Sequence, residues 1–176
     1  MGSAPAFRIL RSMRYLLPLL VLVACANPVH YLADHETPPA DKGTIIGVMD
    51  FDGFGIHREL ALLTEKGTSL VLKPKTNLFV AAIPPGEYRI DYIYMYRWDE
   101  EQVRTFKVAA GEVVYIGNWK AVLGPGIDLC DELDTLRPLL SQRYGKLTIR
   151  TELPGGPGVF YIEVDPQLDP LDGFGR

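Results

Sequence analysis

The chain has 176 residues, of which 47% are hydrophobic, and a formal net charge of −4 at pH 7. This length suits one domain with appended segments. The 17 glycines and 14 prolines argue against long helices as the dominant element. The acidic balance argues against nucleic acid as a partner, because a surface that binds nucleic acid needs an excess of Lys and Arg.

The first 24 residues are expected to be a secretory signal peptide. Three arginines, with no acid among them, precede the apolar run Leu16–Ala24. The run is about half the ~20 residues that a membrane-spanning helix needs, and Pro18 within it also disfavours such a helix. It ends in "LVAC", and these small residues before Cys25 resemble the lipobox of bacterial lipoproteins.

The lipobox resemblance covers residues 1–25 and implies cleavage before Cys25, diacylglycerol on its sulfur and an acyl group on its new amine. Acyl chains anchor a protein by burying CH2 groups in the membrane, at about 0.8 kcal/mol each. Neither Ala26 nor Asn27 is the Asp that often marks inner-membrane retention. The expected location is therefore the outer membrane, with the domain facing the periplasm. The alternative is a plain secretory signal followed by a chance Cys.

Loss of the signal makes the chain more acidic and leaves one thiol. Removal of residues 1–24 leaves 15 basic side chains against 22 acidic ones, a net charge of about −7. Of the two cysteines, Cys25 is assigned to lipid, so no internal disulfide forms and Cys130 stands alone. Its neighbours Leu129 and Leu133 predict a buried thiol, and pairing with another chain is the alternative.

Residues 25–43 are expected to form a lipidated, flexible tether. The stretch "ANPVHYLADHETPPADKG" is rich in Pro and charge and has no apolar periodicity. Its imidazoles and carboxylates, at His30, Asp34, His35, Glu36 and Asp41, do not predict a metal site. A metal site needs its ligands fixed in three dimensions, which a tether does not provide.

From Thr44 the pattern is that of short strands separated by turn signals every eight to twelve residues, which predicts an antiparallel β-sandwich over residues 44–165. The stretch "IHRELALLTEKG" is interpreted as a strand, although a short helix also fits it. The expected strands are 44–51, 56–67, 69–74, 77–83, 87–98, 103–108 and 113–119.

One or two short helices are expected near residues 128–144. Leu129, Leu133, Leu136 and Leu140 are spaced as one face of a helix. Asp128 or Asp131 is the expected N-terminal cap, and Gly145 the expected end. Pro138 lies inside the run and suggests that a second helix begins there.

A C-terminal hairpin is expected after these helices. The segments "KLTIRTEL" and "VFYIEV" alternate like strands, and "PGGPG" between them is a turn signal. Residues 166–176 show no core pattern, which predicts a loose tail.

Two turn motifs carry a resemblance to a known family. "PPGEY" at residues 84–88 is followed about two dozen residues later by "AAGEVVYIG" at 109–117. This arrangement resembles small bacterial lipoproteins of unassigned function with an Ig-like or transthyretin-like sandwich, akin to carboxypeptidase regulatory-like domains. The match covers about residues 44–120. It implies that the Pro-Gly turn leads into a central strand and the Gly-Glu turn into the neighbouring strand, and it implies no catalytic residue.

The sequence contains no recognisable catalytic motif and implies no cofactor. It lacks a Gly-x-Ser-x-Gly elbow and a His-Glu-x-x-His helix. His57 is the one histidine within the expected domain, and no signature surrounds it. Asp99, Glu100 and Glu101 are adjacent acids, which fit a solvated hairpin tip better than a glycosidase pair that must flank a substrate. The protein is therefore not expected to be an enzyme.

The stretch "EYRIDYIYMYRW" at residues 87–98 is the main candidate for a binding surface. Its aromatic residues recur at every second position, so they share one face of a strand. Twelve residues at about 3.3 Å each outrun a typical strand by about twofold. We expect Tyr88, Ile90 and Tyr92 to be core, and hypothesise that Tyr94, Tyr96 and Trp98 line an exposed end. The alternative is that the whole row packs in the core.

These observations predict a lipid-anchored, non-enzymatic protein-interaction or structural module of the bacterial envelope, attached to the membrane through Cys25 and bound to an envelope protein. The alternative function is binding of a glycan or small ligand, for instance peptidoglycan, by Tyr94, Tyr96 and Trp98.

Overall fold

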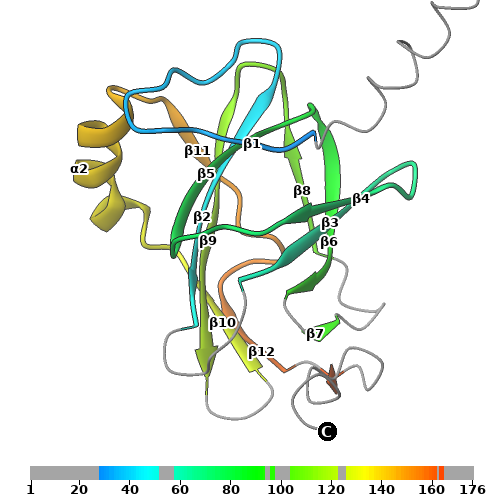
Figure 1. The fold of residues 1–176 in the computed structure, drawn as a ribbon. Coiled ribbons are helices and arrows are strands. Elements are labelled where there is room, and N and C mark those ends of the chain that lie inside the picture. The colour runs from blue at the N-terminus through cyan, green and yellow to red at the C-terminus, as the bar shows by residue number, and fades with distance from the viewer. Residues whose placement is uncertain are drawn as a thin grey trace, which may run out of the picture.

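The computed structural model describes residues 28–51, 58–93, 96–97, 104–122, 126–161 and 163–164. These residues form two β-sheets with one helix beside the first sheet (Figure 1). The expectation of a mainly β chain is confirmed, and the two sheets are consistent with a sandwich. In the described ranges, no helix has the length and apolar character to cross a membrane.

The first sheet has the strand order β1-β5-β2-β9-β10-β12, and β11 also pairs with β9. Its strands are β1 (His30–Tyr31), β2 (Gly43–Asp50), β5 (Leu78–Ile83), β9 (Val113–Val122), β10 (Gly126–Cys130), β11 (Ile149–Thr151) and β12 (Gly158–Tyr161). The β2–β9 and β9–β11 pairs are parallel, and the other pairs of this sheet are antiparallel. The first sheet is therefore mixed, whereas the sequence pattern predicts an antiparallel one.

The second sheet is antiparallel and has the order β13-β7-β6-β3-β4, with β8 also paired to β6. Its strands are β3 (Leu60–Thr64), β4 (Ser69–Leu72), β6 (Gly86–Ile93), β7 (Tyr96–Arg97), β8 (Thr105–Val108) and β13 (Glu163–Val164). The strand interpretation of "LALLT", for which a short helix was the alternative, is confirmed by β3.

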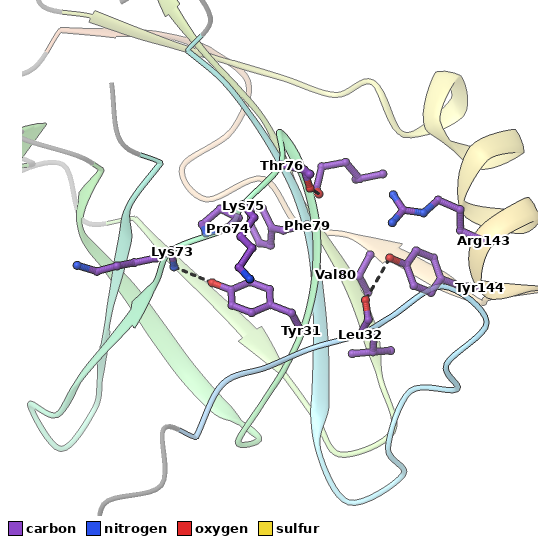
Figure 2. A pocket seen from close by; sticks show the side chains of 11 residues that line it. Tyr31, Leu32, Lys73, Pro74, Lys75, Thr76, Phe79, Val80, Arg143 and Tyr144 are labelled. Carbon is purple, nitrogen blue, oxygen red and sulfur yellow. Dashed lines mark hydrogen bonds between the residues drawn. The ribbon is translucent and has the colours of Figure 1, made fainter. Parts of the chain in front are cut away.

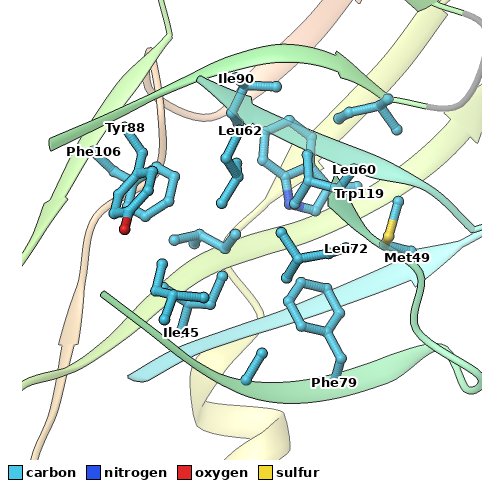
Figure 3. Packing of buried hydrophobic residues seen from close by; sticks show 14 of the residues in the cluster. Ile45, Met49, Leu60, Leu62, Leu72, Phe79, Tyr88, Ile90, Phe106 and Trp119 are labelled. Atoms are coloured by element: carbon cyan, nitrogen blue, oxygen red, sulfur yellow. The ribbon is translucent and has the colours of Figure 1, made fainter. Parts of the chain in front are cut away.

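The main core lies between the two sheets (Figure 3). Ile45 and Met49 of β2 face Leu60 and Leu62 of β3 in this cluster, and Trp119 of β9 is fully buried in it. Burial of each such side chain stabilises the fold by about 1.5–3 kcal/mol. These side chains hold the two sheets together.

A second apolar cluster covers the opposite face of the first sheet. Ile46 and Tyr115 point to this side and pack with Leu133 and Leu140 of the helix α2 (Leu133–Tyr144). Both faces of β2 are therefore covered, which explains why "GTIIGVM" is buried without interruption. Leu32, from the N-terminal segment, belongs to the same cluster.

The helix differs from its prediction at its start and at Pro138. Residues 126–130 form β10, so Leu129 belongs to a strand and not to the helical face. A single helix runs through Pro138. Proline has no N–H, so the backbone carbonyl of Asp134 loses its helical hydrogen-bond partner. Asp134 lies in the exposed first turn, where water can replace that partner. The N-terminal cap is Glu132, which makes no capping bond with its side chain, and not Asp128 or Asp131 as predicted. Asp131 accepts a hydrogen bond from the N–H of Leu133. Gly145 ends the helix with φ 73°, as predicted.

The predicted C-terminal hairpin is wrong. β11 pairs in parallel with the first half of β9, whereas β12 pairs antiparallel with β10. β10 occupies the same side of β9 along its second half. Because β9 is ten residues long, it accommodates two short partners in succession. The turn "PGGPG" therefore carries the chain across the sheet and does not close a two-stranded unit.

The aromatic row does not continue along one strand. β6 ends at Ile93, and Tyr96 and Arg97 fold back to pair antiparallel with Ile93 and Tyr92. The register between β6 and β3 also shifts. Ile90 and Tyr92 pair with adjacent residues of β3, so Asp91 between them has no partner residue in β3 and forms a bulge. This bulge exchanges the two faces. Tyr88 and Ile90 are core as predicted, but Ile93 is buried in the place expected for Tyr92, which is half-buried.

The segment expected to be a tether packs on the domain from Val29 onward. β1 pairs with β5 through His30–Ala82 and Tyr31–Ala81, and the side chains of Val29 and Leu32 are buried. The boundary expected at residue 43 is therefore corrected. The composition of this stretch is polar. Two buried apolar side chains and the backbone hydrogen bonds to the edge of the first sheet hold it on the domain.

Candidate functional site

A cleft of about 260 Å³ lies where the N-terminal segment, the loop after β4 and the end of α2 meet (Figure 2). Phe79 and Val80 of β5 form its apolar floor. Its polar lining consists of Tyr31, Lys73, Lys75, Thr76, Arg143 and Tyr144. We call this the β1–α2 cleft. Its walls come from segments more than 100 residues apart in the sequence.

Tyr31 forms the wall of the cleft on the side of β1. Its backbone is held by the pairing of β1 with β5, and the N–H of Leu32 donates to the carbonyl of Val80 at 2.9 Å. The Tyr31 hydroxyl accepts a hydrogen bond of 2.6 Å from the backbone N–H of Lys73. Burial raises the pKa of this phenol above its usual value of 10, against the opposite effect of the Lys73 bond. Tyr31 is therefore a neutral, positioned phenol at neutral pH.

Arg143 and Tyr144, in the last turn of α2, form the opposite wall (Figure 2). Arg143 Nε lies 2.6 Å from a carboxylate oxygen of Asp34, and its guanidinium lies 5.4 Å from the centre of the Tyr144 ring. The N–H of His35 donates to the carbonyl of Arg143 at 2.6 Å. These contacts tie the helix to the N-terminal segment, so both walls depend on residues 29–36.

The loop between β4 and β5 brings two lysines to the rim. Lys73 Nζ lies 2.8 Å from Glu59, whose carboxylate also accepts a hydrogen bond of 2.7 Å from Tyr92. The bulge in β6 therefore has a role at the cleft, since it turns Tyr92 toward Glu59. Lys75 is exposed. The loop is held by the Thr76 hydroxyl, which donates to the carbonyl of Leu78 at 2.7 Å.

The polar groups of the cleft are cationic and aromatic. Lys75 and Arg143 supply cations, and Tyr31 and Tyr144 supply phenol rings. Lys73 contributes its backbone N–H, and its side chain extends away from the cleft toward Glu59 (Figure 2). Within the described ranges, the lining has no His, Cys, Asp or Glu side chain to transfer a proton or to attack a substrate. An ammonium or guanidinium group attracts anions such as carboxylate and phosphate. The cleft therefore fits an anionic group.

Cys130 does not form a second site. Its thiol is half-buried, donates to a carboxylate oxygen of Asp128 at 3.2 Å and forms no disulfide. Burial, and then Asp128, raise the pKa of the thiol above its usual value of 9.0. A raised pKa disfavours the reactive thiolate. The prediction of a buried Cys130 is therefore met only in part, because the residue has intermediate exposure.

The residues that the sequence singles out for anchoring and binding fall mostly outside the described ranges. Cys25, Tyr94 and Trp98 lie outside them, and so do His57 and the acids at 99–101. Tyr96 is described only as part of β7, which folds back on β6. The hypothesis that Tyr94, Tyr96 and Trp98 line an exposed end therefore stays a prediction.

Within the aromatic segment, the side chains of Tyr88 and Tyr92 are described, and each hydroxyl has a hydrogen-bond partner that offsets the cost of burial. The Tyr88 hydroxyl donates to the carbonyl of Pro84, and its ring stacks on Phe106 with centroids 5.6 Å apart. Tyr92 donates to Glu59. An unpaired buried hydroxyl costs about 1–3 kcal/mol, so these two bonds make the row compatible with the domain core and its margin.

Sequence reasoning misses the β1–α2 cleft entirely. Tyr31 falls in the expected tether, and Lys73, Lys75 and Arg143 carry no motif. The available signal is the apolar cluster Val29, Tyr31 and Leu32 within an otherwise polar stretch. Three apolar residues in a row of four mark a segment that has something to bury, although the pattern does not show against what.

Within the described ranges, no group of three or more His, Cys, Asp or Glu residues is placed to hold a metal ion. Comparison of the chain with protein-family models, with curated proteins and with solved structures gives no match. The cleft and the N-terminal motif are therefore the features that bear on function.

Proposed function

We propose that this protein is a lipid-anchored lipoprotein of the bacterial cell envelope, with a β-sandwich that acts as a non-enzymatic protein-interaction or structural module. The anchor is Cys25, at the end of the lipobox-like "LVAC". The observation that supports a recognition role is the β1–α2 cleft, where Lys75, Arg143 and two tyrosines surround an apolar floor. The proposed location is the outer membrane, with the domain facing the periplasm and an envelope protein as partner.

The composition of the cleft favours binding over catalysis. Two of its cations are held by carboxylates outside the lining, Lys73 by Glu59 and Arg143 by Asp34. Such pairs position a charge without supplying a base within reach of a ligand. Lys75 and the two phenols complete a fixed surface for an anionic group next to apolar contact area. This arrangement suits a partner that is held and not transformed.

The anchor is tested by replacing Cys25 with Ser and following processing in cells supplied with labelled palmitate. We expect the unmodified chain to incorporate label and to sediment with the membrane fraction. The Cys25→Ser variant is expected to lose both properties, and globomycin is expected to block cleavage of the unmodified chain. Label-free, soluble mature protein from the unmodified gene would contradict the lipoprotein proposal.

The recognition role is tested with a charge reversal at the cleft. Lys75→Glu places an acid among the cations, whereas Lys66→Glu makes the same change in the exposed turn between β3 and β4, at the opposite end of β4. Binding of the purified mature protein to isolated cell envelopes is expected to fall with Lys75→Glu and to stay unchanged with Lys66→Glu. Equal binding by both variants would contradict the role of the cleft.

The second candidate function is binding of peptidoglycan or another glycan by the aromatic segment. The observation that keeps it is the return of β7 onto β6, which pairs Tyr96 with Ile93 and keeps this part of the aromatic segment at one end of the second sheet. Tyrosine and tryptophan side chains suit contact with a sugar ring. Retention of the mature protein on purified sacculi, lost on Trp98→Ala, would support this function over the first.

A further inference from the structure

The packed N-terminal segment limits how far the domain can lie from its anchor. This inference rests on the proposed lipid on Cys25. Val29 is 9% exposed and is the first buried residue of the described chain. Four residue steps separate it from Cys25, and a chain spans at most about 3.6 Å per residue, so this distance is at most about 14 Å. A tether reaching residue 43 would allow roughly 65 Å by the same measure.

From Val29 onward the N-terminal segment is held on the domain by several contacts. β1 is paired with β5, Leu32 is bonded to Val80 and buried, and Arg143 is paired with Asp34. The segment therefore moves with the domain. Lipid on Cys25 would hold the β1 edge of the first sheet at the membrane surface, and would not merely tether the domain in the periplasm.

The side chains next to this edge are suited to a membrane interface. Tyr31 is 38% exposed, and its hydroxyl is bonded to the backbone of Lys73. Lys73 and Lys75 belong to the same loop, and both are exposed. Lys73 Nζ also lies 2.8 Å from Glu59, whereas Lys75 is the cation beside Tyr31 (Figure 2). Tyrosine is enriched at the level of lipid head groups, and lysine reaches the phosphates there while its stem stays on apolar surface.

The charge of the whole protein favours the same orientation. The mature chain carries a net charge of about −7, so an anionic membrane repels most of its surface and attracts only a local group of cations. The strand β12 forms the opposite edge of the first sheet, five strand spacings from β1. At about 4.8 Å per spacing it lies roughly 24 Å away.

We propose that Tyr31, Lys73 and Lys75 lie on the membrane, with the two lysines contacting the phosphates of the leaflet that holds the acyl chains. The β1–α2 cleft then opens at the membrane surface, and the anionic group that it fits is the phosphate of an anionic phospholipid. The β12 edge points into the periplasm.

The test uses the full acylated protein in vesicles of phosphatidylethanolamine and phosphatidylglycerol that contain a head-group nitroxide lipid. An environment-sensitive fluorophore is attached at Lys75→Cys or, as the matched control, at Val159→Cys on β12, where the native side chain is 48% exposed. Both variants carry Cys130→Ser, and acylated Cys25 has no free thiol. We expect the nitroxide to remove most of the fluorescence at position 75 and almost none at position 159.

A second arm tests the role of charge. Lys73→Glu in the Lys75→Cys protein is expected to reduce the quenching at position 75 in vesicles with phosphatidylglycerol. Equal quenching at the two positions, or stronger quenching at 159, overturns the orientation. Cross-linking of position 75 to a protein in cells, with no quenching by lipid, also overturns it and assigns the cleft to a protein partner.

The mass of the mature protein separates the two proposals. Absence of the acyl mass contradicts the anchor and removes the basis of the orientation with it. An acylated protein that is not quenched at position 75 contradicts the orientation alone and leaves the lipoprotein proposal standing.

Discussion

Gly117 shows how much of this fold depends on a single small residue. It lies in β9 with φ 104°, a backbone conformation that residues other than glycine rarely adopt. β9 has one residue more than β2 in the register between Ile46 and Val48, so the strand is bulged here. A Cβ at this position would lie 2.2 Å from Leu129 Cδ1. Glycine is therefore needed for both conformation and space.

We predict that Gly117→Ala lowers the free energy of unfolding by about 3 kcal/mol, because backbone strain and overpacking against Leu129 act together. Gly67→Ala is the matched control. Gly67 also has a positive φ, but nothing lies within 4 Å of its Cβ position, so a loss of only about 1 kcal/mol is expected from strain. Urea denaturation measures both. Equal losses would show that the packing argument is wrong.

Glu132 joins the start of α2 to β9 through two side chains. Its carboxylate accepts hydrogen bonds from Lys120 Nζ and, at 2.5 Å, from the Asn118 amide. The hydrogen bonds from Lys120 and, less strongly, from Asn118 hold the pKa of this carboxyl below its usual value of 4.5, against the opposite effect of burial. The folded state therefore binds the proton less tightly than the unfolded chain does. The stabilisation is complete above pH 4.5 and is lost as the pH falls through the lowered pKa.

We predict that Glu132→Gln is less stable than the unmodified protein at pH 7 and that the difference shrinks below pH 4.5. The measurement is urea denaturation across the acidic range. Glu65→Gln, in the exposed turn between β3 and β4, is the control and is expected to leave the pH profile unchanged. A Glu132→Gln deficit that stays constant down to pH 3 would contradict the assignment.

At the scale of elements, β6 shows where alternation works and where it stops. The period of two places Tyr88 and Ile90 in the core, as the structure confirms. The extra residue at Asp91 then exchanges the faces, so Ile93 enters the core and Tyr92 reaches Glu59. A bulge is decided by the pairing partner, here β3, which lies about 30 residues earlier. A pattern within one strand does not contain that information.

The N-terminal segment that contains β1 gives a prediction at the scale of elements. Leu32→Ala is expected to lower the free energy of unfolding by about 2–3 kcal/mol, because the side chain is buried with Ile46 and Leu140. The control Thr37→Ala changes an exposed residue of the same segment, and an effect within about 0.5 kcal/mol is expected. Urea denaturation of both variants tests the packing, since a true tether would make the two changes equally harmless.

At the scale of the whole molecule, the first sheet is the central layer. The second sheet covers one face, and α2 with the N-terminal segment covers the other. The β1–α2 cleft lies where that outer covering meets the sheet edge (Figure 2). The same covering residues therefore serve stability, the cleft and the reach of the anchor.

We predict that a Cys25→Ser protein beginning at residue 25 is more stable than one beginning at Thr44, by at least about 3 kcal/mol. The shorter protein loses the buried side chains of Val29 and Leu32, each of which contributes about 1.5–3 kcal/mol. It also exposes the edge of β5, which favours association of chains. Thermal denaturation and sedimentation measure the two effects. Equal melting temperatures would contradict the corrected domain boundary.

The amino-acid pattern alone predicts the mainly β class, most strand positions, the helix with its end at Gly145 and the lipobox-like motif at Cys25. These depend on local signals, namely alternation, turn residues and short motifs. The tertiary structure decided the parallel pairing of β2 with β9, the partners of β11 and β12, the bulge in β6 and the cleft. Each of these depends on which distant segments meet, and burial of Val29 and Leu32 against β5 and α2 is a contact that no local pattern encodes.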